Sequence, residues 1–474
     1  MGNKMHSRVV AIGFLFLALF MFLIGAILAV VMQLELSEPG LQVISPATYH
    51  HSVNYHGLFM LYGVVIPAFI GLVIWYLPGV LAAENILIPK AGYLYGFIYV
   101  AGIVVLIAGG VIDLQKEPQL GSWNYYGNVE QNTSVLSNLI SAESGLLLTA
   151  IALLLIMLSL MLTVLFKRDK SGFFSLPPLA WSVLVLASLT IVPLLIYLYS
   201  GINDLFYPQP EHSYESMMLA EPGYLSLRHL ETPLIFLILM FGLNLRTFVS
   251  GENARTSNGL ANVMIVLMAA LFVSGWILGL TFDTGVPVDP LLFTIQAFLY
   301  IFAAMVYLAG YTLLLISLVK RQVRFGPHIL FITFSYVFVL VAVIMSVMLT
   351  IAPIDFHYHD SWFVNGYQHY ALFGGVMFSI FAAIYVMLLQ WRTSLIASVL
   401  GYTHFTLTLF TVISLFWSYT VLGLAGMPMK FPDYSFQFEV IHSTNTVITF
   451  VLLSAQLFFI AVIVSSFFGR KQDL

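Results

Sequence analysis

The sequence contains no cysteine and very little charge. Only 8% of its 474 residues are Asp, Glu, Lys or Arg, whereas soluble globular domains carry about 25%. The absence of cysteine excludes disulfides, thiolate metal sites, cysteine-ligated iron–sulfur clusters and heme attached through a C-x-x-C-H motif. A redox metal would therefore be bound by His, Met, Tyr or carboxylate side chains. The net charge of −4 gives no indication of a nucleic-acid partner.

Long apolar runs fill most of the chain, and 60% of the residues are hydrophobic. A membrane-spanning helix needs about 20 mostly apolar residues, and helices or closed barrels are the only structures that satisfy their backbone groups in lipid. We therefore predict an all-α integral membrane protein of twelve transmembrane helices, forming a single domain over residues 1–474. The predicted spans are 9–32, 55–78, 91–113, 139–166, 178–199, 231–249, 260–281, 290–318, 326–352, 366–391, 396–421 and 440–468.

The positive charges support this count. Cytoplasmic segments of membrane proteins are enriched in Lys and Arg. With twelve helices and both termini cytoplasmic, fourteen of the 17 Lys and Arg residues fall inside, and only Lys116, Arg228 and Lys430 fall outside. An odd number of helices would destroy this asymmetry. Most acidic residues fall in the outer loops, where they form either an ordinary solvated rim or a docking surface for a basic partner such as a soluble cytochrome.

Five of the twelve histidines lie within or at the mouths of predicted spans: His56, His229, His369, His404 and His442. Ionisable residues in membrane helices indicate functional sites, and imidazole is a common ligand of heme iron. All but His404 begin helices that run from outside to inside, so they lie at similar depth. For His229 and His442 a snorkelling interfacial histidine is an equally good interpretation. His404 is predicted to be a hydrogen-bonded core histidine.

Glycines distinguish two of these histidines. Gly57 follows His56, and Gly374 and Gly375 lie shortly after His369. Small residues beside a ligand leave room for a flat macrocycle, although they are also common simple packing devices in membrane helices. Depth and glycine context together favour His56 and His369 as a heme-ligand pair near the outer face.

Four stretches, in the right order, resemble subunit I of the heme–copper oxidases. They are MQLELSEPG at 32–40, NYHGLFMLYGVVIPAFIGLVIWYLP at 54–78, DSWFVNGYQHYALFGGVMFSI at 360–380 and GLAGMPMKFPDY at 423–434. The resemblance covers the whole chain and implies a subunit I-like helical bundle. It also implies that His56 and His369 are the axial ligands of the low-spin heme.

Other positions depart from the family's pattern. Tyr367 stands where the high-spin heme would have its histidine, and the stretch at 275–283 lacks the copper-binding histidines. His229 and Glu231 retain part of the sixth-helix motif without its tyrosine. We therefore expect one heme and no copper.

The arginines that contact heme in the family are also replaced. Met429 and Lys430 stand for the pair that binds the propionates, and Gln33 stands for the arginine that ends the first helix. The loss of that arginine favours heme b over an a-type heme. Lys430, Gln33 and Trp362 are candidate partners of the propionates.

These features predict an electron-transfer subunit of a larger respiratory or redox complex in a prokaryotic inner membrane. Its expected partners are other membrane or periplasmic redox subunits, with a cytochrome c or a quinone among the candidates. One alternative is a dioxygen or nitric oxide reductase whose non-standard site includes Tyr367, His229 and Glu231. Another alternative is a heme-free scaffold or transporter. His357 and His359 form an H-x-H pair that is either a solvated loop or a surface metal site.

Overall fold

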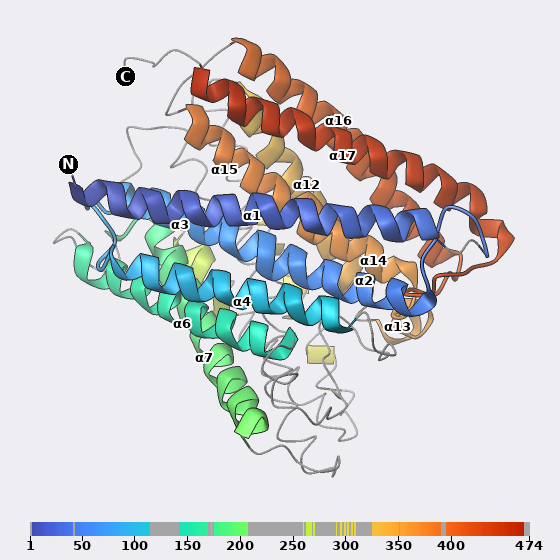
Figure 1. Cartoon of the computed structure of the whole chain (residues 1–474), viewed down its shortest axis with the longest axis horizontal. Helices are drawn as coiled ribbons and strands as arrows, with labels where there is room; N and C mark the ends of the chain where they lie inside the picture. The colour runs from blue at the N-terminus through green and yellow to red at the C-terminus, as the bar shows by residue number, and fades with distance from the viewer. Residues whose placement is uncertain are drawn as a thin grey trace. The chain divides into compact units, whose positions relative to one another are not determined.

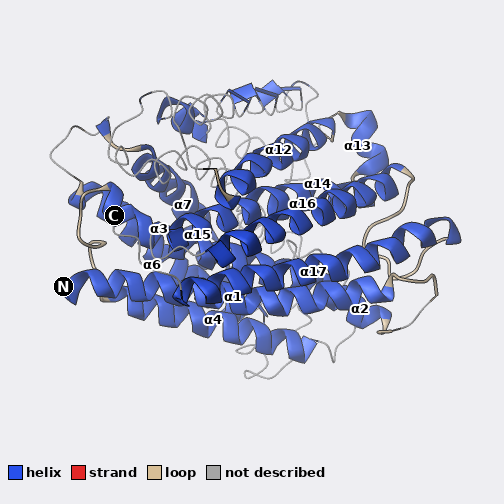
Figure 2. Ribbon diagram, turned by 90° about the horizontal axis from the view of Figure 1, so that it is seen from above, coloured by secondary structure: helices blue, strands red, loops and turns tan. Residues whose placement is uncertain are grey.

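The computed structural model describes residues 2–40, 43–113, 142–168, 172, 175–206, 325–349, 351–389 and 395–468, with scattered residues between 259 and 309. Within these ranges every long element is a helix (Figure 1). Figure 2 shows no strand among the described elements, which contain one isolated β-bridge, between Ser361 and Pro428. The long helices are α1 (Gly2–Glu35), α2 (Pro46–Leu58), α3 (Ile66–Val80), α4 (Ala91–Asp113), α6 (Ala142–Lys167), α7 (Pro178–Phe206), α12 (Pro327–Met348), α14 (Trp362–His369), α15 (Phe378–Leu389), α16 (Leu395–Leu424) and α17 (Glu439–Phe468).

Several shorter elements complete the described helices. Two are π-helical: η1 (Phe59–Val65) continues α2 into α3, and η3 (Tyr370–Met377) continues α14 into α15. The others are α13 (Ala352–Tyr358) and the 3₁₀ turn η4 (Phe436–Phe438).

The described residues include nine helical runs long and apolar enough to cross a membrane. They correspond to the first five and the last four predicted spans, which confirms a multi-pass, all-helical membrane protein. The predicted spans at 231–249, 260–281 and 290–318 lie outside the described residues, apart from scattered positions. The total of twelve and the cytoplasmic location of both termini stay predictions.

The chain divides into two compact units. The first comprises residues 1–25, 50–240 and 255–299, and the second comprises residues 26–49, 241–254 and 300–474. In the first unit, α1 runs antiparallel to the η1–α3 run. The Arg8 guanidinium lies 5.1 Å from the centre of the Trp75 ring at one end of this pair, and Met21 approaches Gly63 further along.

Close helix contacts in the first unit depend on glycine. α4 and α6 lie side by side (Figure 1). A Cβ atom on Gly145 would lie 2.5 Å from the backbone nitrogen of Leu106, so no side chain fits between the two backbones. Small residues allow such close approach in lipid, where van der Waals packing drives helix association.

The second unit has an aromatic and polar core between α12, α15, α16 and α17. Phe331 is fully buried there, and its ring packs against those of Phe378, Phe381 and Phe405. Beside it, His404 has no exposed surface. Its Nδ1 lies 3.0 Å from the Tyr385 hydroxyl, and its Nε2 lies 3.3 Å from Oε1 of Gln456. The prediction of a hydrogen-bonded core histidine is confirmed.

We expect Gly145→Ala to destabilise the protein because its methyl group would force α4 and α6 apart. Overpacking of this kind typically costs about 1–3 kcal/mol. Thermal unfolding of the detergent-solubilised protein measures the effect as a lower midpoint temperature. Gly13→Ala on α1 is the matched control, since a Cβ at Gly13 meets nothing within 4 Å. Equal stability of the two variants would contradict this account of the α4–α6 contact.

Candidate heme site

His56 lies in the last turn of α2 and is half-buried. Its Nδ1 lies 2.9 Å from the carbonyl oxygen of Gly25 on α1. A carbonyl can only accept a hydrogen bond, so Nδ1 carries the proton and Nε2 bears the lone pair. A Cβ on Gly25 would lie 2.7 Å from the sulfur of Met60, which belongs to a flexible side chain.

His369 is the last residue of α14 and has the same internal arrangement. Its Nδ1 lies 2.7 Å from the carbonyl oxygen of Asn365, one turn earlier on the same helix. The proton is again fixed on Nδ1, and Nε2 again bears the lone pair. The ring packs against Phe416 at 5.2 Å and Tyr419 at 5.4 Å between centroids, both on α16.

Each of these histidines is followed by a π-helical segment. η1 begins three residues after His56, and η3 begins directly after His369. A π-helix is rare, and π-helical turns inside α-helices often mark functional sites. The sequence gives no signal for either segment, since both consist of ordinary apolar and small residues.

The glycines after the histidines differ in what surrounds them. Gly57 is half-buried within α2. Gly374 packs against Phe338, because a Cβ there would lie 2.7 Å from the Phe338 Cβ atom. The carbonyl of Gly375 accepts hydrogen bonds from Ser335 and Ser379. Gly374 therefore acts as a helix-packing residue. The alternative interpretation, that it leaves room for a macrocycle, does not hold for this glycine.

His442 lies in the first turn of α17 and is fully buried. Its Nε2 lies 3.0 Å from the sulfur of Met427, and its ring lies 5.2 Å from Trp362 and 4.4 Å from Tyr434. The interpretation of His442 as a snorkelling interfacial histidine is wrong. The segment between α16 and α17 folds over the ring, a contact that the local sequence does not reveal.

Two further candidates lie beside this histidine. Gln33 is buried near the end of α1, where its Nε2 donates to the His442 carbonyl at 3.3 Å. Lys430 is half-buried in the segment before α17 and adopts a left-handed conformation with φ of 68°. Burial lowers the pKa of Lys430, and the negative charge of Asp360 partly opposes this shift.

Of the three residues proposed for a second site, the structure describes Tyr367 alone. Tyr367 is half-buried in α14, two residues before His369. His229 and Glu231 lie outside the described residues, as does the stretch at 275–283. Across the part of the chain that the structure describes, no three His, Cys, Asp or Glu side chains are grouped so that they could bind a metal ion.

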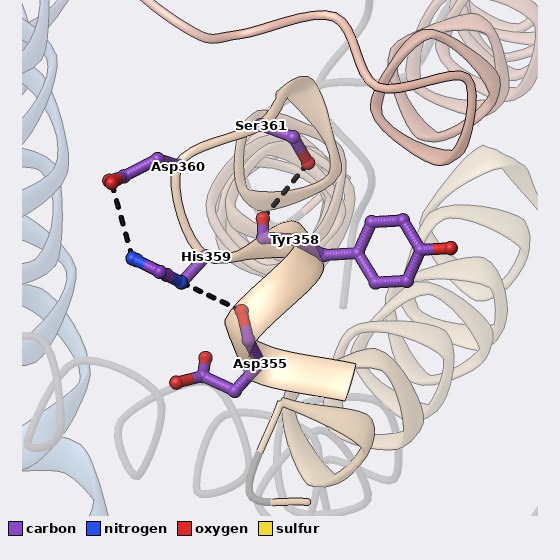
Figure 3. Close-up of polar contacts among 5 residues, drawn as sticks. All are labelled: Asp355, Tyr358, His359, Asp360 and Ser361. Carbon is purple, nitrogen blue, oxygen red and sulfur yellow. Dashed lines mark hydrogen bonds and ion pairs between the residues drawn. The ribbon is translucent and has the colours of Figure 1, made fainter. Parts of the chain in front are cut away.

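Of the H-x-H pair, His357 lies in the last turn of α13, and His359 lies in the turn that follows the helix (Figure 3). His359 donates from Nδ1 to the carbonyl of Asp355 at 2.7 Å, and its Nε2 faces the Asp360 carboxylate at 3.2 Å. Both ring nitrogens therefore act as donors, which favours the charged imidazolium. His357 is exposed on this turn.

We expect the pKa of His359 to lie above its ordinary value of about 6.5. The hydrogen bond to the Asp355 carbonyl raises this pKa most, and the Asp360 and Asp355 charges add to the shift, while burial opposes it. Because the folded-state pKa is raised, the associated stability is fully present below pH ~6.5 and is lost as the pH rises through the folded pKa. Histidine NMR of the labelled protein measures the titration.

Asp360→Asn should lower the pKa of His359 and leave part of the shift, since the backbone hydrogen bond persists. His357→Asn serves as the control that removes the neighbouring ring. A His359 titration below the ordinary value, or one unchanged by Asp360→Asn, would show that these contacts do not set its charge.

Comparison with known proteins places the whole arrangement in one family. The sequence profile described as cytochrome c and quinol oxidase polypeptide I matches residues 9–456. "Probable cytochrome c oxidase subunit 1-beta" of Nocardia farcinica is 26% identical over 451 residues, which cover 91% of this chain and 74% of the relative. "Cytochrome c oxidase subunit 1" of Thermostichus vulcanus is 26% identical over 473 residues, covering 95% and 81%.

The fold is also similar to a solved structure. A heme–copper terminal oxidase dimer studied by cryo-electron microscopy matches with a TM-score of 0.76 at 13% identity, covering 100% of this chain and 85% of that one. The profile match spans nearly all of the chain, and the spans and the resemblance at four stretches agree with it. The chain therefore belongs to the cytochrome c and quinol oxidase polypeptide I family, and is a multi-pass membrane heme protein of respiratory electron transfer or oxidase chemistry.

Proposed function

We propose that this protein is an electron-transfer subunit that binds one low-spin heme b through Nε2 of His56 and Nε2 of His369, near the outer face of the membrane. The observation that carries the proposal is the matched hydrogen bonding of the two rings. Each Nδ1 donates to a backbone carbonyl, Gly25 for one and Asn365 for the other. Histidines that bind metals almost always donate their other ring nitrogen in this way.

These hydrogen bonds prepare both side chains for ligation. They fix the tautomer, orient the ring and raise the basicity of Nε2. A bound heme would supply one-electron redox chemistry, and if His56 and His369 both held its iron, no position would remain for a substrate. The protein's own contribution is to hold the two imidazoles in this orientation and to exclude water with apolar helix faces.

Sequence supports the proposal that copper is absent. The copper-binding histidines expected near 275–283 are missing, and Tyr367 replaces the histidine of a second heme. A site built from Tyr367, His229 and Glu231 would lack the three imidazoles of a copper centre. We therefore favour electron transfer over a gas reductase, and the paired imidazoles argue against a heme-free scaffold or transporter.

Partners of this subunit would reach it from the outer side. Glu38, Asp433 and Glu439 surround Tyr434, and their charges add to burial in raising the pKa of its hydroxyl to about 12. Such an acidic region attracts a basic partner over a distance set by the ionic strength. A cytochrome c or a periplasmic redox subunit fits this charge, and a quinone could exchange electrons from the lipid. The bacterial relatives support a prokaryotic cell membrane.

The unsubstituted protein, purified in detergent, should contain one heme per chain with sharp low-spin bands. Its pyridine hemochrome should be that of heme b, and carbon monoxide should not shift the reduced spectrum because no coordination position is open. His56→Ala and His369→Ala should each abolish the low-spin spectrum. His357→Ala, which removes an exposed histidine twelve residues before His369, should leave the low-spin spectrum unchanged.

Other outcomes would select the alternatives. Two hemes with a carbon monoxide shift would overturn the proposal in favour of a reductase, and Tyr367, His229 and Glu231 would then be tested in turn. Absence of heme after expression with heme supply would favour the scaffold or transporter.

A further inference from the structure

Each of the two π-helical segments accepts a hydrogen bond from a hydroxyl group on a neighbouring helix. In the first unit, the Tyr99 hydroxyl on α4 donates to the Tyr62 carbonyl of η1 at 2.6 Å. In the second unit, the Ser335 hydroxyl on α12 donates to the Gly375 carbonyl of η3 at 2.7 Å. Tyr99 and Ser335 are each 1% exposed. The segments that follow the two candidate heme ligands are therefore contacted in the same way.

The Tyr99 hydroxyl replaces a backbone donor that the helix does not supply. In an α-helix the Tyr62 carbonyl would accept from the N–H of residue 66, and in a π-helix it would accept from that of residue 67. The N–H of Ile66 donates to the Leu61 carbonyl instead, and residue 67 is a proline, which has no N–H. A buried carbonyl needs a donor, and the Tyr99 hydroxyl is that donor.

Because of Pro67, this hydrogen bond favours one of two possible windings of the helix. In regular α winding the N–H of Ile66 would donate to the Tyr62 carbonyl, and Pro67 would deprive the Gly63 carbonyl of its donor. In the observed π winding, the carbonyl that Pro67 deprives is that of Tyr62. The Tyr99 hydroxyl lies on the Tyr62 carbonyl, so it stabilises the π winding relative to the α winding.

In the second unit a pair of hydroxyls contacts the π-helical segment. The hydroxyl oxygen of Ser379, in the first turn of α15, lies 2.6 Å from that of Ser335 and 3.0 Å from the Gly375 carbonyl. The pair has two protons to share between the carbonyl and each other. The N–H of Phe378, only three residues on, also donates to this carbonyl. The two serines therefore hold the helix at the junction where η3 ends and α15 begins.

We propose that Tyr99 and Ser335 are positioning residues for the two heme ligands. Tyr99 holds η1 in its π winding and so sets the direction of His56, and Ser335 does the same for His369 through η3. This inference rests on the proposed function. A π-turn is wider than an α-turn, so its winding fixes how the part of the helix with the histidine is rotated relative to the part that follows. For His56, this rotation also decides whether Nδ1 meets the Gly25 carbonyl on α1.

Tyr99→Phe tests the assignment in the first unit, because it removes one oxygen atom and keeps the packed ring. The readout is the electron paramagnetic resonance spectrum of the full-length ferric protein loaded with heme. Its g values depend on the angle between the two axial imidazole planes, so we expect the largest g value to shift while the heme content is retained. Tyr95→Phe is the matched control and should leave the g values unchanged. Tyr95 lies one turn earlier on α4, and its hydroxyl contacts Ser159 on α6 at 3.2 Å.

The serine pair is tested in the same way. Ser335→Ala removes the donor on α12 and leaves the Ser379 hydroxyl within reach of the Gly375 carbonyl. The double variant Ser335→Ala/Ser379→Ala removes both hydroxyls, so it should shift the largest g value further than Ser335→Ala alone. Ser466→Ala is the control and should cause no shift, since this buried serine donates to a carbonyl within the regular helix α17.

Unchanged g values in both Tyr99→Phe and the double serine variant, with the heme retained, would overturn the inference and leave the hydroxyls as packing contacts. If the double variant fails to fold, Tyr99→Phe decides alone, because it removes almost no volume from the core.

A measurement on the heme-free protein separates this inference from the proposed function. The ¹⁵N chemical shift of the His56 Nδ1 reports its hydrogen bond to the Gly25 carbonyl. Tyr99→Phe should change this shift, and Tyr95→Phe should not. An unchanged shift in Tyr99→Phe overturns the inference for η1 whether or not heme binds. An unsubstituted protein that carries no bis-histidine heme, but in which Tyr99→Phe changes the His56 shift, overturns the proposed function alone.

Discussion

The hydrogen bond between a histidine Nδ1 and a helix carbonyl is the interaction on which the proposed site depends. Without it, either ring nitrogen of His56 or His369 could carry the proton, and the ring could rotate about its side-chain bonds. With it, Nε2 is the lone-pair nitrogen in both residues.

The two histidines obtain this hydrogen bond in different ways. His369 uses a carbonyl of its own helix, one turn away, so the bond needs only local geometry. His56 uses a carbonyl of α1, so its orientation requires that two helices lie close together. The orientation of His56 is therefore a property of the fold of the first unit.

Sequence was sufficient for the features that depend on local composition. Nine of the predicted spans appear as helices, and the identity of His404 as a core histidine followed from its depth in an apolar helix. His56 and His369 were selected by depth, glycine context and family resemblance. The tautomer of His56 could not be predicted, because the carbonyl that accepts its hydrogen bond lies 31 residues away in the chain.

The features that sequence missed depend on distant contacts or on backbone geometry. His442 is at the start of a helix, where a snorkelling side chain is common, but the segment that carries Met427 and Tyr434 covers it. Gly374 follows a candidate ligand, yet it packs on Phe338 from α12. Neither π-helical segment has a composition that separates it from the surrounding α-helix, because the wide turn is set by how the whole helix packs.

The π-helical segments have a consequence for how relatives are compared. A π-turn holds one more residue than an α-turn, so it offsets the two parts of a helix by about 100°, the angle of a single residue. The part that carries His56 or His369 is thus out of phase with the part that follows η1 or η3. Removing one residue from either segment would restore regular α-helical winding and turn the imidazole towards a different neighbour. A one-residue gap within 59–65 or 370–377 in an alignment would thus mark a relative whose histidine faces elsewhere, even though the histidine itself is retained.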